Sequence, residues 1–369
     1  MVKSPTGDGF LRSLTAVAKV TSVEETVVTR AIRIDHALQR WRARRAREAG
    51  YTAEVIPYTS YGSTSWLRLL ARVLLAKRSQ RHADTPTGIR GWRNFVGVPV
   101  ENASLTVDIE GRSYEVQADY SGIVDVVVDV DLEPGWHQIG LSSEGSEVAT
   151  ALVFVVDPQI TFGVVSDVDD TVMVTALPRP LLAVWHTFVV NEHARATTPG
   201  MPVLYERLSS RYPGAPFIYL STGAWNVAPT LTRFLSRNLY PAGALLLTDW
   251  GPTADRWFRS GREHKRSSLE RLALEFPQIK WLLVGDDGQH DESIYRDFLA
   301  QHPDNAAAVC IRRLSPSEAV LAGSSFRGHA STRDSTVPWL YASDGAGLAD
   351  KLESLGLLEP APQQPEIEA

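Results

Sequence analysis

The chain has 369 residues, of which 44% are hydrophobic and 22% are charged. This length suggests about two domains, and the composition excludes a largely disordered chain. A single cysteine excludes a scaffold held by internal disulfides and makes the reducing cytoplasm the expected location. We expect no signal peptide, and no uncharged apolar stretch approaches the roughly 20 residues of a membrane-spanning helix.

The net charge of −6 hides an asymmetry along the chain. Residues 1–100 contain 17 Lys and Arg against 7 Asp and Glu, whereas the remainder contains 20 against 36. Within the basic part, residues 27–47 predict an amphipathic helix in an N-terminal segment that ends at Gly50. Its apolar residues at near-helical spacing are Ala31, Ile34, Leu38 and Trp41. A basic helix of this kind is either a docking surface for an anionic partner or an ordinary solvated face.

From residue 51 to 157, short segments rich in Val and aromatic residues are separated by turn signals. Residues 66–76 fit a helix and a strand alike, and we favour a strand because Pro57, Gly62 and Ser63 precede them. The clearer strands cover residues 104–111, 112–119, 122–132, 135–143 and 148–157. This spacing predicts an antiparallel β-sandwich domain over residues 51–157.

After Pro158 the pattern changes to continuous apolar runs that alternate with helical stretches. The runs are TFGVVSD, PFIYLST, GALLLTD, KWLLVGD and AAAVCIR, and the helical stretches cover residues 201–212, 227–238 and 265–276. Such alternation is typical of a parallel sheet with helices on both faces. We therefore predict an α/β domain over residues 158–356 and a disordered tail, rich in Pro, Gln and Glu, at residues 357–369.

Polar residues follow four of the five apolar runs, and ligands of open α/β sheets bind beyond the carboxyl ends of the strands. The first run ends in Asp167, and Asp169, Asp170 and Thr171 follow shortly after it. One carboxylate at this point can attack phosphorus to form an aspartyl-phosphate, while the other is aimed at the leaving oxygen. A calcium loop is a poor alternative, because its Gly and Glu positions hold Val172 and Pro178.

The second run ends in Ser221 and Thr222, whose hydroxyls can donate to a phosphoryl oxygen, although such residues also begin helices. Lys265 is expected at the opening of a helix, where the helix dipole already favours an anion. Most lysines at such positions are merely solvated. Lys265 is therefore a candidate phosphate-binding residue only because the other motifs accompany it.

In the fourth run, Gly285 is expected to allow a tight exit from the strand into a loop with three carboxylates, those of Asp286, Asp287 and Asp291. Crowded carboxylates repel one another unless a cation offsets them, and Mg²⁺ is the obvious candidate. Zinc is disfavoured because His290 has no second His or Cys at ligand spacing. Cys310, inside the fifth run, is interpreted as a small buried residue of the core.

These motifs, in this order, resemble those of the haloacid-dehalogenase-like (HAD-like) phosphohydrolases. The resemblance is closer to the phosphatidate phosphatases of the actin-patch-protein type, and it covers about residues 160–315, with a fainter likeness around PYTSYG. The segments that carry it are DVDDTVMVT, PGMPVLYERL, LSTGAWNVAPTLTRFL and GDDGQHDESIY. The chain departs from that family at residues 221–225, where Ser-Asn-Ser-Pro-Trp is usual, and at Asp287, where Ser is usual.

The resemblance implies a Rossmann-like HAD fold and a Mg²⁺-dependent phosphatase that converts phosphatidate to diacylglycerol. Asp167 would be the nucleophile, and Asp169 would protonate the leaving alcohol and then activate water. Ser221 and Lys265 would hold the phosphoryl oxygens. Further substrate-binding residues would be Thr171, Thr222, Gly223 and Trp225. The implied metal site consists of Asp167, Asp169 and Asp286, with Asp291 in support.

Two alternatives stay open, because a superfamily resemblance defines the reaction better than the substrate. The first is a HAD-type phosphatase for a soluble phosphomonoester, and the second, less favoured, is a lipid- or protein-binding module without activity. If the substrate is phosphatidate, we expect peripheral binding to an anionic membrane and no nucleic-acid partner. Residues 176–190 are then either an acyl-chain entrance or an ordinary buried helix. The residues that would line this entrance are Leu181, Leu182, Trp185 and Phe188.

Overall fold

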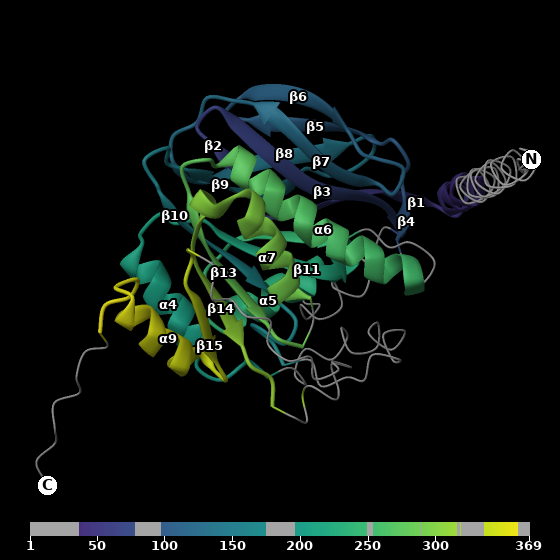
Figure 1. The fold of residues 1–369 in the computed structure, drawn as a ribbon. Coiled ribbons are helices and arrows are strands. Elements are labelled where there is room, and N and C mark those ends of the chain that lie inside the picture. Colours follow the sequence, from purple (N-terminus) through teal and green to yellow (C-terminus); the bar gives the residue numbers. More distant parts are fainter. Residues whose placement is uncertain are drawn as a thin grey trace, which may run out of the picture.

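The computed structural model describes residues 37–77, 97–174, 196–248, 254–288, 290–315, 318 and 336–360, and of residues 254–260 only the backbone. Within this part, the protein has a mixed α/β architecture with a nine-stranded sheet followed by a six-stranded parallel sheet (Figure 1). A helix over residues 37–48 precedes both sheets, which confirms the later part of the helix predicted for residues 27–47, while residues 27–36 lie outside the described part. No helix among the described residues is long and apolar enough to cross a membrane.

The nine-stranded sheet has the strand order β1-β3-β2-β9-β8-β5-β6, and β4 and β7 pair with β3. All pairs are antiparallel except β2 with β9. Its strands are β1 (Tyr51–Pro57), β2 (Ser60–Ser63), β3 (Trp66–Lys77), β4 (Val98–Pro99), β5 (Ser104–Ile109), β6 (Arg112–Gln117), β7 (Ile123–Asp129), β8 (Gly135–Ser143) and β9 (Ala149–Val156). The ambiguous segment 66–76 is therefore a strand, as we favoured.

Alternating burial explains why this half of the chain forms strands. In β5, Leu105, Val107 and Ile109 are buried, whereas Ser104 and Asp108 are exposed, which is the period of two of a half-buried strand. Inward-facing residues of β1, β3, β5, β7, β8 and β9 share one core. β1 also contacts β8 and β9 without pairing with them, so the sheet folds back over its own core. The description of this region as a two-sheet sandwich stays a prediction.

The second sheet is parallel throughout, with the order β12-β11-β10-β13-β14-β15. Its strands are β10 (Phe162–Asp167), β11 (Phe217–Ala224), β12 (Ala244–Thr248), β13 (Lys280–Asp286), β14 (Ala306–Arg312) and β15 (Trp339–Ala342). Each predicted apolar run forms one of the first five strands. β15 was not predicted, because its four residues are only half-buried at the edge of the sheet.

Helices cover both faces of this sheet, since every residue of β10 and β12 is buried. The helices are α4 (Met201–Arg211), α5 (Ala228–Arg237), α6 (Ala254–Glu275), α7 (Asp291–Gln301) and α9 (Gly345–Ser354), with the short 3-10 turns η3 (Trp225–Val227) and η4 (Pro303–Asn305). α6 packs with α7, and α4 packs with α9 (Figure 1). The chain runs outward from β10 to β11 and β12 and then returns to β13, so the strand order reverses beside β10.

The two sheets are joined by a common core as well as by the chain. Ile56, Tyr58, Tyr61 and Leu70 of the first sheet region belong to the same hydrophobic cluster as the parallel strands. α6 lies along the boundary (Figure 1), where its Arg271 forms an ion pair with Asp125 of β7. The predicted boundary near residue 157 therefore separates two sheets that pack closely, and the division into independent domains stays a prediction.

The C-terminal residues after α9 are held against α4. Leu358 is buried, and the Tyr212 hydroxyl donates to the carbonyl of Leu357 at 3.0 Å. Arg207 of α4 donates to the carbonyl of Glu359. The chain is thus ordered by these contacts to at least Glu359, beyond the residue 357 at which we expected a tail to begin, and residues 361–369 lie outside the described part.

Candidate active site

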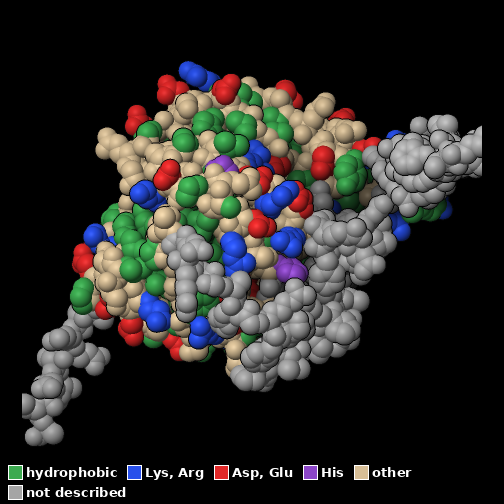
Figure 2. Space-filling view, in the orientation of Figure 1, with side chains coloured by type: hydrophobic (Ala, Val, Ile, Leu, Met, Phe, Trp, Pro, Cys, Tyr) green, Lys and Arg blue, Asp and Glu red, His purple; other side chains and the backbone are tan. Residues whose placement is uncertain are grey.

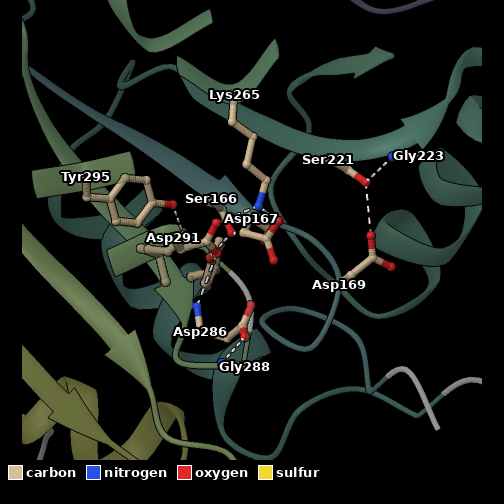
Figure 3. A network of polar contacts seen from close by, with 12 residues as sticks. Ser166, Asp167, Asp169, Ser221, Gly223, Lys265, Asp286, Gly288, Asp291 and Tyr295 are labelled. Carbon is tan, nitrogen blue, oxygen red and sulfur yellow. Dashed lines mark hydrogen bonds and ion pairs between the residues drawn. The ribbon is translucent and has the colours of Figure 1, made fainter. Parts of the chain in front are cut away.

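Two carboxylates lie side by side because they end neighbouring parallel strands. Asp167 is the last residue of β10 and Asp286 the last of β13, and these two strands pair directly. A third carboxylate comes from Asp291, the first residue of α7. All three side chains are buried and face one another (Figure 3). They lie beside the reversal in strand order, where open α/β sheets bind their ligands.

Lys265 is the counter-charge of this cluster. Its Nζ lies 2.5 Å from Oδ1 of Asp167 and 2.6 Å from Oδ1 of Asp291, and its side chain is buried. The expectation that Lys265 opens a helix is wrong, because α6 begins at Ala254 and Lys265 lies in its interior. The helix dipole therefore contributes little here, and Lys265 acts through its own charge.

Burial and mutual repulsion decide how the cluster holds protons. Burial, together with the neighbouring carboxylates, raises the pKa of Asp167 and of Asp286 well above the usual range, against the attraction of Lys265. Burial alone would lower the pKa of Lys265, but Asp167 and Asp291 raise it above its usual value. Lys265 is therefore charged at neutral pH, whereas Asp167 and Asp286 give up their protons less readily than exposed carboxyl groups do.

Gly285 makes room for the third carboxylate. A Cβ at this position would lie 2.7 Å from Oδ2 of Asp291, closer than real side chains approach. The same oxygen accepts the backbone N–H of Asp286 at 3.3 Å. The sequence suggested that Gly285 permits a tight exit from the strand, and the structure adds that it lets Asp291 pack against the backbone.

Oxygen atoms of Asp167, Asp286 and Asp291 lie within 4.8 Å of one another, an arrangement that could hold a metal ion. Oδ2 of Asp167 is buried and has no hydrogen-bond partner among the described residues, so it is available to a cation. An all-oxygen, carboxylate-rich site suits a hard divalent ion. Asp169 is not part of this group, so its carboxylate is not placed with the other three predicted ligands.

Asp169 instead faces Ser221 across the site (Figure 3). The Ser221 hydroxyl donates to Oδ2 of Asp169 at 3.0 Å and accepts the backbone N–H of Gly223 at the same distance. The register between β11 and β12 shifts between Leu220 and Ala224, which turns this part of the backbone into an irregular loop. The motif after the first strand and the motif after the second strand are thus brought together as predicted from their strand ends.

The loop after Asp167 is held by a residue that sequence reasoning missed. Asp170 has a φ of 59°, a left-handed conformation that is costly for a residue other than glycine. The guanidinium of the buried Arg312 donates to the Asp170 carbonyl at 2.7 Å. Arg312 is the last residue of β14, so the rule of strand ends that identified the motifs after the first, second and fourth runs would have identified it too.

The four residues predicted to bind substrate make different contacts in the structure. Thr222 packs against α6, where a Cβ on Gly261 would lie 2.9 Å from its methyl group. Trp225 is only 6% exposed and stacks on Tyr58. Thr171 is fully buried, and its hydroxyl has no hydrogen-bond partner among the described residues. Of the four, Gly223 contributes through its backbone, and the proposed contacts of all four with a substrate stay predictions.

Three other candidate residues are also located. Asp287 is not part of the carboxylate cluster, and its Oδ1 accepts the backbone N–H of Leu314 at 2.9 Å. Cys310 is fully buried, and burial raises its pKa to about 12, so it is a core residue as interpreted. His290 precedes α7 and is exposed. The apolar segment 176–190 lies outside the described residues.

Comparison with known proteins gives independent information on residues 162–313, which match the family described as "Phosphatidate phosphatase APP1, catalytic domain". The phosphatidate phosphatase APP1 of Saccharomyces cerevisiae is 23% identical over 238 residues, which cover 61% of this chain and 40% of that protein. An uncharacterized protein of Schizosaccharomyces pombe is 25% identical over 150 residues, which cover 40% of this chain and 24% of that protein. The chain therefore spans less than half the length of either relative.

Solved structures add nothing to this assignment. A carbohydrate acetylesterase from Xanthomonas citri covers 74% of this chain and 73% of its own length, with 9% identity and a TM-score of 0.27. A likeness this weak carries no argument about fold or activity. The family match, by contrast, begins at the first residue of β10 and contains Asp167, Ser221, Lys265 and Asp286. Residues 162–313 are therefore similar to the catalytic domain of phosphatidate phosphatase APP1.

Proposed function

We propose that this protein is a Mg²⁺-dependent phosphatidate phosphatase with a HAD-like catalytic domain. The observation that carries the proposal is the different surroundings of two carboxylates on one loop. Asp167 is buried beside Lys265 and two further carboxylates, whereas Asp169 is partly exposed and bonded to the Ser221 hydroxyl. Two carboxyl groups in different surroundings can take different roles, one as nucleophile and one as acid and base.

In the first step, an oxygen of Asp167 attacks the phosphorus of phosphatidate and forms an aspartyl-phosphate. The bond from phosphorus to the glyceride oxygen breaks, and protonated Asp169 gives its proton to that oxygen, which leaves as diacylglycerol. In the second step, Asp169 takes a proton from a water molecule whose oxygen attacks the same phosphorus. The bond between phosphorus and the Asp167 oxygen breaks, phosphate leaves, and Asp167 is again a free carboxylate while Asp169 is again protonated.

Asp167, Asp286 and Asp291 would hold the Mg²⁺, because their oxygens lie close together and Asp167 has a free Oδ2. When bound, the ion offsets the negative charge of the carboxylates and of the substrate phosphate. Lys265 holds Asp167 and Asp291 in their present orientation. Ser221 would turn its hydroxyl proton, which Asp169 now accepts, toward a phosphoryl oxygen of the substrate.

We expect purified protein to release phosphate from phosphatidate in mixed micelles faster than from any of a panel of soluble phosphomonoesters. A strong chelator should abolish the release, and Mg²⁺ but not Ca²⁺ should restore it, because Ca²⁺ takes a larger and looser set of ligands. A preference for a soluble phosphomonoester would assign the alternative substrate class. Full activity in metal-free buffer would contradict the metal site, and no release from any phosphomonoester would contradict phosphatase function.

The helix at residues 37–48 supports docking to an anionic membrane surface. Ala43 and Ala46 are buried against the first sheet, so the helix is anchored to the protein. Trp41 is 48% exposed, and basic and apolar side chains lie together at this helix (Figure 2). The exposed arginines are Arg40, Arg42, Arg44, Arg45 and Arg47. Each basic residue near an anionic surface contributes about 1 kcal/mol of attraction.

We expect sedimentation with vesicles that contain anionic lipid to rise with the anionic fraction and to weaken with salt. A quadruple variant with Gln at positions 42, 44, 45 and 47 should bind at least about 10²-fold more weakly, given about 1 kcal/mol per charge. The charge-matched control carries Gln at four other exposed basic positions, which are Arg112, Arg211, Arg237 and Lys351. Equal losses in both variants would show a general charge effect and would remove the helix from the binding surface.

A further inference from the structure

Tyr58 connects the first sheet region to the phosphoryl-binding loop of the catalytic domain. Its hydroxyl donates to the backbone carbonyl of Trp225 at 3.1 Å, and its ring stacks on the Trp225 indole with centroids 4.7 Å apart. The two residues are 167 positions apart in the chain, and both are buried. We propose that Tyr58 is a positioning residue for the reaction, which acts by fixing the backbone that carries Ser221.

Tyr58 is itself held rigidly, as a positioning residue must be. Its backbone N–H donates to the carbonyl of Leu70 in β3 at 3.1 Å. The fully buried Ser60 donates to the Tyr58 carbonyl at 3.3 Å and accepts the N–H of Leu70 at 2.9 Å. The ring lies in the hydrophobic cluster that both sheets share. Residues of the first sheet thus hold Tyr58 through both backbone and side-chain hydrogen bonds.

On the other side, Trp225 directly follows the irregular end of β11. Two residues earlier, the N–H of Gly223 donates to the Ser221 hydroxyl and so directs the proton of that hydroxyl toward Asp169. Thr248 of β12 also holds this loop, by donating to the carbonyl of Thr222 at 2.8 Å. Tyr58 and Thr248 therefore hold the loop at its two ends, one from each neighbouring element.

The hydrogen bond of Tyr58 is made to a backbone carbonyl rather than to a side chain. Its loss frees the Trp225 peptide while the stacked rings keep their packing. Small shifts of groups that contact the reacting phosphate reduce turnover strongly, because the rate depends on their alignment. This inference rests on the proposed function, since it assigns Tyr58 to the same phosphoryl-transfer site.

The experiment is a double-mutant cycle between Tyr58→Phe and Ser221→Ala, with a chromogenic phosphomonoester as substrate and Mg²⁺ present. The Phe variant keeps the stacked ring and loses only the hydroxyl. We expect it to lower kcat about three- to tenfold, the effect of one lost hydrogen bond. In the Ser221→Ala background the same substitution should lower kcat less than about twofold, because Tyr58 then has no Ser221 hydroxyl left to position. Affinity for orthovanadate, a mimic of the transferring phosphoryl group, should fall in parallel with kcat.

Tyr61→Phe is the matched control. Tyr61 is also a buried tyrosine of the first sheet whose hydroxyl reaches the catalytic domain, but it donates at 2.7 Å to Glu275, at the C-terminal end of α6. It should lower the melting temperature about as much as Tyr58→Phe does and leave kcat and orthovanadate affinity unchanged.

The outcomes separate the inference from the proposed function. An active wild type in which Tyr58→Phe behaves like Tyr61→Phe, or in which the Tyr58 and Ser221 effects simply multiply, overturns the positioning role alone. A wild type that neither hydrolyses a phosphomonoester nor binds orthovanadate overturns the proposed function, and the role of Tyr58 with it.

Discussion

Replacing Asp167 by Asn should lower phosphate release by more than about 10³-fold, because an amide is a very poor nucleophile. The substitution is nearly isosteric, so the lost rate cannot be attributed to a cavity. It also removes one charge from a cluster in which burial and neighbouring carboxylates already raise the pKa of Asp167. We therefore expect the free energy of unfolding in metal-free buffer to stay the same or to rise.

The measurement combines steady-state phosphate release with urea unfolding of the same preparations. Asp304→Asn, which changes an exposed carboxylate in η4, is the control and should match the wild type in both. If Asp167→Asn retained more than a few per cent of the wild-type rate, the covalent mechanism would be wrong. A large loss of stability would show instead that Asp167 serves mainly as the structural partner of Lys265.

Much of the fold could be predicted because strands of a parallel sheet are marked by their own local sequence. The run TFGVVSD becomes β10 with every residue buried, and KWLLVGD becomes β13 beside it. Once these runs are identified as parallel strands, their last residues must lie at one edge of the sheet. The proximity of Asp167 to Asp286 therefore follows from sequence, without knowledge of any side-chain contact.

What could not be predicted depends on contacts between segments far apart in the chain. The helical period of residues 265–276 shows a helix but not its start, so Lys265 was placed at a terminus when it lies inside α6. The partners of Lys265 are Asp167 and Asp291, which are 98 and 26 positions away, so its local sequence does not predict these contacts. The same holds for Tyr58 and Trp225, which meet only because the two sheets pack together.

Arg312 and Gly285 were within reach of sequence reasoning but were misjudged for different reasons. Arg312 ends a predicted strand, but its local sequence does not show that its guanidinium donates to the carbonyl of Asp170, 142 positions away. Gly285 was noted for its conformational freedom, whereas its missing side chain matters because Asp291 occupies the space. The residue type alone therefore does not show which contact requires it, and the packing in the structure does.

The buried charges make Lys265 the position where stability and activity are most tightly linked. Its ammonium is the cation placed between Asp167 and Asp291, at 2.5 and 2.6 Å, and Asp286 lies in the same cluster. Removing one partner of a buried ion pair is far more costly than replacing the whole pair, because the remaining charges lose their compensation. Lys265→Met keeps most of the side-chain volume and removes only the charge.

We expect Lys265→Met to lower the free energy of unfolding by about 3–5 kcal/mol in metal-free buffer. Added Mg²⁺ should recover part of this loss, because a bound divalent ion offsets the same carboxylates. The folded variant should still release phosphate at least about 10²-fold more slowly than the wild type, since a fixed cation beside the transferring phosphoryl group is gone. Urea unfolding with and without Mg²⁺, followed by activity at saturating Mg²⁺, measures both effects.

Two further variants test whether the effects of Lys265→Met come from the lost charge at this site. Lys351→Met removes an exposed lysine from the helix α9 and should change the free energy of unfolding by less than about 0.5 kcal/mol. The double variant Lys265→Met with Asp291→Asn removes one positive and one negative charge, so it should be more stable than Lys265→Met alone, while its phosphate release stays at least as slow. If Lys265→Met unfolded at the same urea concentration as Lys351→Met, the carboxylates around Lys265 would not be charged together. The ion pairs would then not be what holds this site in its geometry.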